Sequence, residues 1–351
     1  MAYTTINKSS NYFNTVIYSG NNTTGRGITG VSFAPDFLWL KERTNDVGSH
    51  FLVDNVRTQT GTGGGWLQTN ATDSATVDTN VITSLDSDGF TVGNDDDTNG
   101  SGDTYVGWNW KANGAGSSNT DGSINSTVSV NTTSGFSMVS WTATNANGAT
   151  IGHGLGTTPA IVITKRLNST GDWLVGGSAI DTARGGANSL LLLNSTSAMD
   201  SNSEVYQTFS STTFQVGVNA GSFANGATLI SYCFKDVQGY SKFSSYIGNG
   251  STDGTFVYTG FKPAWVMMKK TNNTNSANWL MLDNKRNTFN VSSKALNAGL
   301  NQAEINASWV NTDFLSNGFK LRTTDETINN GSYIYMAFAE APLVGTNGVT
   351  A

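Results

Sequence analysis

The chain has 351 residues, enough for two or three ordinary domains with substantial cores. Only 13% of its residues are charged and 40 are glycine, so solubility rests on Asn, Ser, Thr and Gly, a mixture that favours turn-rich β structure over helices. A net charge of −6 excludes nucleic acid as a main partner, and a single cysteine, Cys233, excludes an intrachain disulfide.

The N-terminal stretch MAYTTINKSSNYFNTVIYSG has no basic segment followed by an apolar core, so we expect no secretion signal. No apolar run approaches the ~20 residues that span a bilayer, so we expect no membrane insertion. The uncharged polar composition is nevertheless typical of proteins that work outside cells. A component of a virus particle, made in the host cytoplasm and released by lysis, reconciles the two observations.

Three apolar runs along the chain begin with proline and carry a lysine six positions later: PDFLWLK at Pro35, PAIVITK at Pro159 and PAWVMMK at Pro263. A closing strand ends at an aromatic residue 75 positions after each proline (110 − 35, 234 − 159, 338 − 263), at Trp110, Phe234 and Phe338. Strand-like runs that begin at Phe13, Phe136 and Phe243 precede the prolines. This spacing predicts a unit of about 100 residues that is present three times.

Within each unit, short apolar runs are separated by Gly, Asn, Asp and Ser clusters, which is the pattern of strands and turns. We therefore predict an all-β fold of three tandem β-sandwich repeats of jelly-roll or lectin-like type, over residues 1–113, 114–238 and 239–351. The proline runs are apolar on both faces, which predicts strands that are covered on each side.

The connections predict how the repeats are attached. Residues 112–127 are rich in Gly, Ser and Asn, whereas the connection at 236–243 is short. We therefore expect the second and third repeats to be closely docked and the first to be attached more loosely. The best candidate for a helix is residues 292–309, although Gly299 interrupts it.

Each repeat also contains Asp-x-x-Arg about 20 residues after its proline, as Asp54 with Arg57, Asp181 with Arg184, and Asp283 with Arg286. The preferred interpretation is a turn in which Asp accepts backbone N–H bonds and Arg pairs with it or ties down a loop. The alternative is a catalytic or ligand-binding role. Together with the three prolines, these pairs mark the repeat.

The most acidic loop, GNDDDTNGSGD at residues 93–103, contains Asp95, Asp97, Asn99 and Asp103. It matches the start of an EF-hand loop, but Val106 stands where a bidentate Glu is required. A solvated hairpin turn is the preferred interpretation, and a looser calcium site is the alternative. No other metal or cofactor is expected.

Four tryptophans near loops are candidates for stacking on a sugar ring, with a place in the core as the alternative: Trp66, Trp173, Trp279 and Trp309. His153, in GHGLGTTP, could be a general base, but no carboxylate or nucleophile pattern accompanies it. We therefore predict no catalytic residue and no enzymatic activity.

The motifs FAPDFLWLK, VDNVR, LDSDGFTVG, GDTYVGWNWK, GHGLGTTPAIVITKR, GYSKFSSYIGNGSTDGTFVYTGFKPAWVMMKK and GSYIYMAFAEAP span most of residues 13–342. With them, the chain resembles a repeat family of unknown function found in structural proteins of marine bacteriophages and viral metagenomes. The resemblance implies a concanavalin-like sandwich and a place on the virion surface, and it brings no catalytic residues.

Together, these observations predict a non-enzymatic virion protein, exposed as a head decoration, fibre or tail appendage. It would form homo-oligomers and contact capsid or tail proteins. The first alternative is a glycan-binding adhesin module that contacts the host surface. A polysaccharide-degrading enzyme is a further alternative, but it needs paired carboxylates in a cleft, and no such pair stands out in the sequence.

Overall fold

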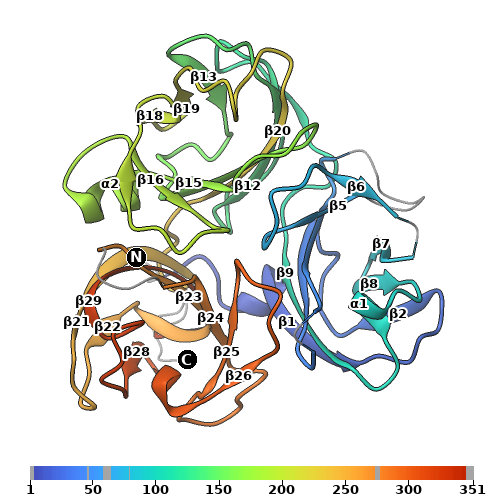
Figure 1. Ribbon diagram of the computed structural model, residues 1–351, viewed down its shortest axis with the longest axis vertical. Coiled ribbons are helices and arrows are strands. Elements are labelled where there is room, and N and C mark those ends of the chain that lie inside the picture. Colours follow the sequence, from blue (N-terminus) through green and yellow to red (C-terminus); the bar gives the residue numbers. More distant parts are fainter. Residues whose placement is uncertain (1–3, 46, 58–64, 79, 273–276, 345–351) are drawn as a thin grey trace.

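The computed structural model describes residues 4–45, 47–57, 65–78, 80–272 and 277–344. These residues form an all-β structure whose antiparallel sheets are arranged as three units around a common centre (Figure 1). We use unit 1, unit 2 and unit 3 for residues 1–113, 114–238 and 239–351. Each unit packs one large sheet against a sheet of three strands.

In unit 1 the short helix η1 (Ser9–Asn11) precedes the first strand, and α1 (Asp96–Asn99) precedes the last one. The small sheet contains, in spatial order, β2 (Arg26–Thr29), β8 (Gly89–Val92) and β7 (Ile82–Asp86). The large sheet contains β1 (Phe13–Ser19), β9 (Thr104–Trp110), β3 (Phe37–Glu42), β4 (His50–Asp54), β5 (Gly65–Gln68) and β6 (Thr76–Val77).

In unit 2 the large sheet contains β10 (Ser117–Asn119), β11 (Ser126–Asn131), β12 (Phe136–Thr142), β20 (Thr228–Phe234), β14 (Ile161–Arg166), β15 (Leu174–Gly176), β16 (Ser189–Leu192) and β17 (Asp200–Ser201). The helix α2 (Ser178–Arg184) connects β15 to β16. The small sheet contains β13 (Ala149–Gly152), β19 (Thr213–Val216) and β18 (Tyr206–Phe209). The expected linker at 112–127 is therefore part of the sheet, because β10 and β11 extend it beyond β12.

In unit 3 the large sheet contains β21 (Ser241–Asn249), β29 (Asn330–Pro342), β23 (Phe261–Lys270), β24 (Leu280–Asp283), β25 (Lys294–Asn297) and β26 (Ile305–Asn306). The small sheet contains β22 (Phe256–Tyr258), β28 (Gly318–Leu321) and β27 (Thr312–Leu315), and η2 (Ser308–Val310) precedes β27.

The helix expected over 292–309 is wrong, because β25, β26 and η2 occupy that range. Ala295 and Leu296 are both fully buried and face different apolar clusters, one inside the sandwich and one at the centre of the molecule. A strand covered on both faces accommodates neighbouring buried side chains of this kind, so tertiary packing overrides the weak helical pattern.

The strand that follows each proline lies in the interior of its large sheet, between the closing strand and a short hairpin partner. In β3, Leu38 and Leu40 point into the sandwich, whereas Phe37 and Trp39 point to the molecular centre. The same division holds for β14 and β23. The prediction that these strands are covered on both faces is confirmed.

Pro35 and Pro159 stand just before their strands, as predicted, whereas Pro263 lies inside β23. The pairing of β23 with β29 shifts register on both sides of Pro263. A bulge accommodates proline within a strand because the missing N–H then interrupts no ladder bond.

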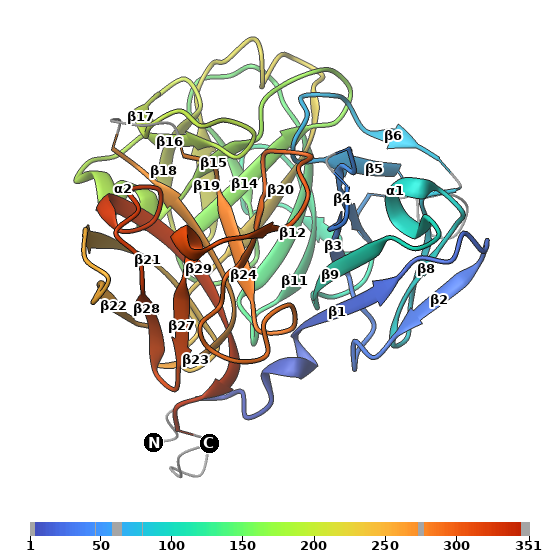
Figure 2. The same ribbon diagram turned by 60° about the horizontal axis from the view of Figure 1, so that its bottom comes forward.

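The central faces of the three large sheets form one apolar cluster (Figures 1 and 2). Phe13 of unit 1 stacks on Phe338 of unit 3 with ring centroids 5.1 Å apart, and Phe37 lies 4.6 Å from the ring of Tyr232 of unit 2. The expectation that the first unit is loosely attached is therefore wrong, because its aromatic residues are part of this shared core. Over the described residues, no helix has the length and apolar character needed to cross a membrane.

Candidate functional site

Each unit reaches into the next through the lysine that lies six positions after its proline. The Nζ atoms of Lys165, Lys269 and Lys41 donate to backbone oxygens of Thr72, Thr196 and Asn301 at 3.2, 3.0 and 3.5 Å. These three acceptors are equivalent, because each lies five residues after a buried leucine of β5, β16 or β25. All three lysines are buried, so their charges lie at the junctions between units and away from the outer surface.

A ring N–H donor lies beside each lysine and makes a second bond across the same junction. Trp173 and Trp279 donate through Nε1 to the backbone oxygens of Gln68 and Leu192 at 2.8 and 2.9 Å. In unit 1 the donor is His50, whose Nε2 lies 2.8 Å from the oxygen of Asn297.

The protonation of His50 follows from its two neighbours. Its Nδ1 accepts a hydrogen bond from Trp39 Nε1 at 2.9 Å, which leaves the proton on Nε2. Burial, reinforced by the charge of Lys41, lowers the pKa of His50 well below its ordinary value. His50 is therefore a neutral donor to Asn297 near neutral pH.

Sugar stacking by Trp173 and Trp279 is ruled out, because both side chains are 0% exposed and hold junctions together. Trp66 and Trp309 are half-buried and lie in different units, where they pack against the sandwich cores of units 1 and 3. The structure does not bring the four tryptophans together. The core alternative fits Trp173 and Trp279 best.

The Asp-x-x-Arg pairs of units 1 and 3 are buried turns with the same geometry. Asp54 accepts from the backbone N–H groups of Val56 and Arg57, and Arg57 Nε donates to it at 2.6 Å. Asp283 and Arg286 repeat these bonds, again with 2.6 Å between Nε and the carboxylate. The turn interpretation is confirmed for these two pairs.

Both buried pairs also bind the neighbouring unit. The hydroxyl of Tyr232 in unit 2 donates to Asp54 at 2.7 Å, and Nε1 of Trp108 in unit 1 donates to Asp283 at 3.1 Å. Tyr232 and Trp108 are equivalent, since each lies two residues before the closing aromatic. The third equivalent residue is Met336, which has no such donor.

Unit 2 departs from the pattern at this point. Asp181 lies in α2 and accepts from the backbone N–H of Ser189, while Arg184 lies at the exposed end of the helix and donates to the oxygen of Ala187. The predicted turn with an Asp–Arg pair is therefore wrong for Asp181 and Arg184. Met336, the residue of unit 3 that is equivalent to Tyr232 and Trp108, could not have donated a hydrogen bond to a buried carboxylate in unit 2.

The acidic loop of unit 1 folds on itself. Asp95 caps α1 by accepting from the N–H of Asp97, and Asp103 accepts from Asn45. Asn99 is buried. Its side-chain Nδ2 donates to the backbone oxygens of Gly93 and Thr23, and its Oδ1 accepts from the backbone N–H of Asn21. Within the residues that the structure describes, no three His, Cys, Asp or Glu side chains gather as a metal site.

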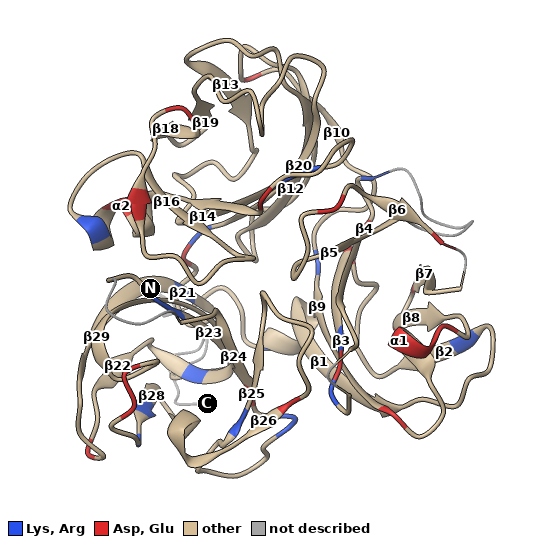
Figure 3. Ribbon diagram, viewed as in Figure 1, with Lys and Arg blue, Asp and Glu red and all other residues tan. Residues whose placement is uncertain are grey.

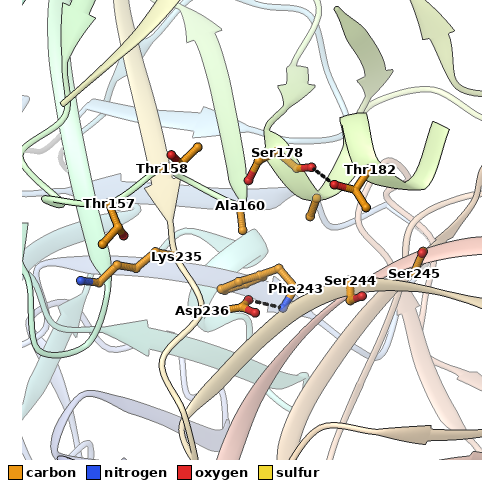
Figure 4. A pocket seen from close by; sticks show the side chains of 11 residues that line it. Thr157, Thr158, Ala160, Ser178, Thr182, Lys235, Asp236, Phe243, Ser244 and Ser245 are labelled. Carbon is orange, nitrogen blue, oxygen red and sulfur yellow. Dashed lines mark hydrogen bonds between the residues drawn. The ribbon is translucent and has the colours of Figure 1, made fainter. Parts of the chain in front are cut away.

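The structure has open hollows at its surface. One of about 340 Å³ lies between units 2 and 3, with Phe243 at its side (Figure 4). Ser178 donates to the oxygen of Pro159 at 2.9 Å and Lys235 donates to Leu155 at 3.3 Å. Because Ser178 and Lys235 are engaged in these bonds, and among the described residues neither is hydrogen-bonded to a base that would activate it, the hollow suits binding through hydrogen bonds better than nucleophilic chemistry.

The junctions were not predicted from the sequence, where Lys41, Lys165, Lys269 and His50 were given no role and Trp173 and Trp279 were given a different one. The available signal was a lysine at the same position of three otherwise apolar strands, followed about eight to ten residues later by Trp or His. A charged residue that recurs in buried strands needs a buried partner, and the partner lay in the next unit.

A family model described as Domain of unknown function (DUF7483) matches residues 8–342 of the chain. Searches of curated proteins and of solved structures gave no significant match.

Proposed function

The chain belongs to the family described as Domain of unknown function (DUF7483). From its structure we propose that it is a non-enzymatic structural protein exposed on the surface of a bacteriophage particle. In this role the protein presents a rigid body with polar loops. It contacts other virion proteins and further copies of itself.

The observation that carries the proposal is the closed ring of three junctions. Each junction contains an equivalent hydrogen bond of 2.9 Å from a backbone N–H of one unit to a backbone oxygen of its neighbour. The three bonds run from Ala75 to Leu167, from Met199 to Thr271 and from Glu304 to Arg43. Together with the buried lysines and the shared apolar core, these bonds oppose hinge motion between units. Resistance to such motion suits a protein that bears load in an assembly.

The outer surface supports the same role. Charged residues are few in each of the three units (Figure 3), and 13% of the residues of the chain are charged. A surface rich in Asn, Ser and Thr makes many weak hydrogen bonds and few salt-dependent contacts. This composition suits repeated contacts in a particle that meets varied ionic conditions.

The test is to locate the protein in purified particles. Particles from a lysate of a phage that encodes this chain are purified by density gradient, and the protein is sought by mass spectrometry and by antibody labelling in the electron microscope. We expect it in a fixed ratio to the capsid protein and on the particle surface. Its recovery only in the soluble fraction of the lysate would overturn the proposal.

Glycan binding is the second candidate, and exposed aromatic side chains of unit 3 favour it. Phe256 and Tyr258 are 42% and 56% exposed and alternate on β22 with Val257, which points into the sandwich core. Two aromatic rings on the outer face of one strand form a platform on which sugar rings stack.

A glycan array with the intact protein tests this candidate. We expect binding that falls by up to ~10-fold in Tyr258→Ala, since ring stacking contributes about 0.5–1.5 kcal/mol. Val218→Ala, at a similarly exposed apolar side chain in unit 2, is the matched control. Equal glycan binding by the wild type and Tyr258→Ala would reject this platform as the site.

A further inference from the structure

A hollow of about 450 Å³ at the junction of units 1 and 2 contains a buried guanidinium with an unused donor. We call it the unit 1–2 pocket, and its lining includes Arg57, Ala75, Leu167, Thr127, Ser140 and Thr228. Arg57 is only 7% exposed. Among the described residues, none accepts a hydrogen bond from its Nη1.

The other two nitrogens of Arg57 each make a hydrogen bond. Nε donates to Asp54 at 2.6 Å and Nη2 donates to the backbone oxygen of Leu52 at 3.1 Å. The hydroxyl of Tyr232 donates its proton to Asp54, and its oxygen also interacts with the guanidinium, but it makes no hydrogen bond with Nη1. A buried donor without an acceptor costs about 1–3 kcal/mol, so the pocket is expected to receive an acceptor.

Unit 3 shows what that acceptor is in an equivalent place. Arg286 makes the same bonds through Nε to Asp283 and through Nη2 to Met281, at 2.6 and 2.9 Å. Its Nη1 then donates to the carboxylate of Glu304 at 3.2 Å. The same carboxylate is bound by Arg43 of unit 1 through two bonds of 2.9 Å.

Two differences distinguish the junction of units 1 and 2 from that of units 3 and 1: one removes the carboxylate and the other removes its second guanidinium. Ala75 occupies the position of Glu304, since Ala75 lies eight residues after Leu67 of β5 and Glu304 lies eight residues after Leu296 of β25. The backbone N–H groups of both residues also make equivalent hydrogen bonds to the neighbouring unit. Leu167 occupies the position of Arg43, eight residues after its proline. The guanidinium is therefore present in both units, while in unit 1 a methyl group stands where unit 3 has the carboxylate side chain.

We propose that the unit 1–2 pocket binds the carboxylate of an acidic sugar, with Arg57 Nη1 as its charged donor. The hydroxyl-bearing residues Thr127, Ser140 and Thr228 come from three neighbouring strands and line the same hollow, where they can meet the hydroxyl groups of a sugar ring. Arg57 already pairs with Asp54, and Leu167 adds no second cation, so binding is weaker than the internal bond of Glu304.

The test uses the intact protein and three probes at constant ionic strength: sodium glucuronate, sodium acetate and glucose. Binding is followed by calorimetric titration and by the thermal midpoint. We expect glucuronate to bind at least ~10-fold tighter than acetate or glucose, and to raise Tm by about 2 °C at ten times its Kd. No binding of glucuronate, or equal binding of acetate, would overturn the proposal.

The variant Ala75→Glu places an internal carboxylate where the probe is expected to bind. We expect it to abolish glucuronate binding and to raise Tm in the absence of the probe. Ala75→Gln fills a similar volume without the charge and is expected to raise Tm less. Glucuronate binding that survives in Ala75→Glu would place the site elsewhere, and the wild-type titration remains decisive if this variant does not fold.

The matched control makes the opposite substitution in unit 3, which then has alanine at the position where unit 1 has Ala75. Glu304→Ala frees Nη1 of Arg286 and leaves Arg43 without its carboxylate. We expect this variant to lose stability and to regain part of it in acetate, which the wild type does not do to the same extent. The absence of any rescue by acetate would argue against a carboxylate-binding geometry shared by the two junctions.

Discussion

Buried lysines set the electrostatics of the junctions at the scale of single residues. Burial lowers the pKa of Lys165 and of Lys269 to about 8, and only for Lys165 do nearby carboxylates, Asp73 and Asp172, oppose the effect. Each ammonium group is solvated by backbone oxygens of two units, an arrangement that tolerates a charge at some cost. The junctions therefore respond to alkaline pH.

We predict that the free energy of unfolding rises between pH 7 and pH 9. The folded lysines release their protons near pH 8, whereas the unfolded ones hold theirs to their ordinary value of 10.5, so the unfolded state binds more protons in this window. The gain is about 1 kcal/mol per lysine, measured by urea unfolding. Above pH 10 the buried tyrosines, whose pKa values are raised, oppose it.

The variant Lys269→Met should show a smaller rise over the same window, because it has lost one of the titrating groups. Lys262→Met is the matched control, since its ammonium group lies on the surface beside Glu340. A slope that is identical in the wild type and Lys269→Met would show that Lys269 titrates normally in the folded protein.

The hydrogen bond from the hydroxyl of Tyr232 to Asp54 joins units 1 and 2, and its contribution to stability can be measured. Tyr232→Phe removes the donor to Asp54 and leaves a buried carboxylate with one acceptor site unsatisfied. We expect a loss of about 1–3 kcal/mol in urea unfolding. Tyr258→Phe, at an exposed hydroxyl, should change stability by less than about 0.5 kcal/mol. Equal effects of the two changes would contradict the role of this bond.

At the scale of elements, α2 replaces in unit 2 the buried turn of units 1 and 3. The helix ends at Gly185, whose φ of 77° is left-handed and whose N–H closes bonds to Asp181 and Thr182. Its first residues line the hollow between units 2 and 3. At the C-terminal end of α2, the left-handed conformation of Gly185 favours glycine because a side chain would be strained there.

We predict that Gly185→Ala costs about 1 kcal/mol of stability, because alanine adopts this left-handed conformation with strain. Gly221→Ala is the control, since Gly221 lies outside the left-handed region and an added methyl group would meet only Asn219 at 3.4 Å. Urea unfolding of both variants checks the prediction. A Gly185→Ala variant as stable as wild type would mean that α2 can end in another way.

At the scale of the whole molecule, the three sandwiches depend on one another. Trp265 of unit 3 lies 5.8 Å from the ring of Trp110 of unit 1 and is 1% exposed. Separating the units would expose the aromatic faces of all three large sheets to water. The cost of exposing so much apolar area couples the stabilities of the units.

We therefore predict a single cooperative thermal transition with an enthalpy of about 250 kcal/mol. Trp265→Ala should lower its midpoint by about 5 °C without splitting it, since a large cavity at the centre destabilises all three units together. Differential scanning calorimetry provides the measurement. Two or three separate transitions would show that the units unfold independently.

The amino-acid sequence by itself determined the strand-and-turn character, the spacing of the repeated motifs and the covering of the proline strands on both faces. These features are local or periodic, so alternating and continuous apolar runs report them directly. The turn role of Asp54 with Arg57 and of Asp283 with Arg286 was also accessible, because both partners lie within four residues.

Only the tertiary structure decided what the buried polar groups bind across the junctions between units. Lys165 finds its acceptor 93 residues away, and Asp54 receives its hydrogen bond from Tyr232, 178 residues away. Trp173 and Trp279 were therefore misjudged, since a loop-proximal tryptophan becomes part of a core once another unit covers it. The unused donor of Arg57 became visible for the same reason, because its environment is formed by two units that meet only in the folded protein.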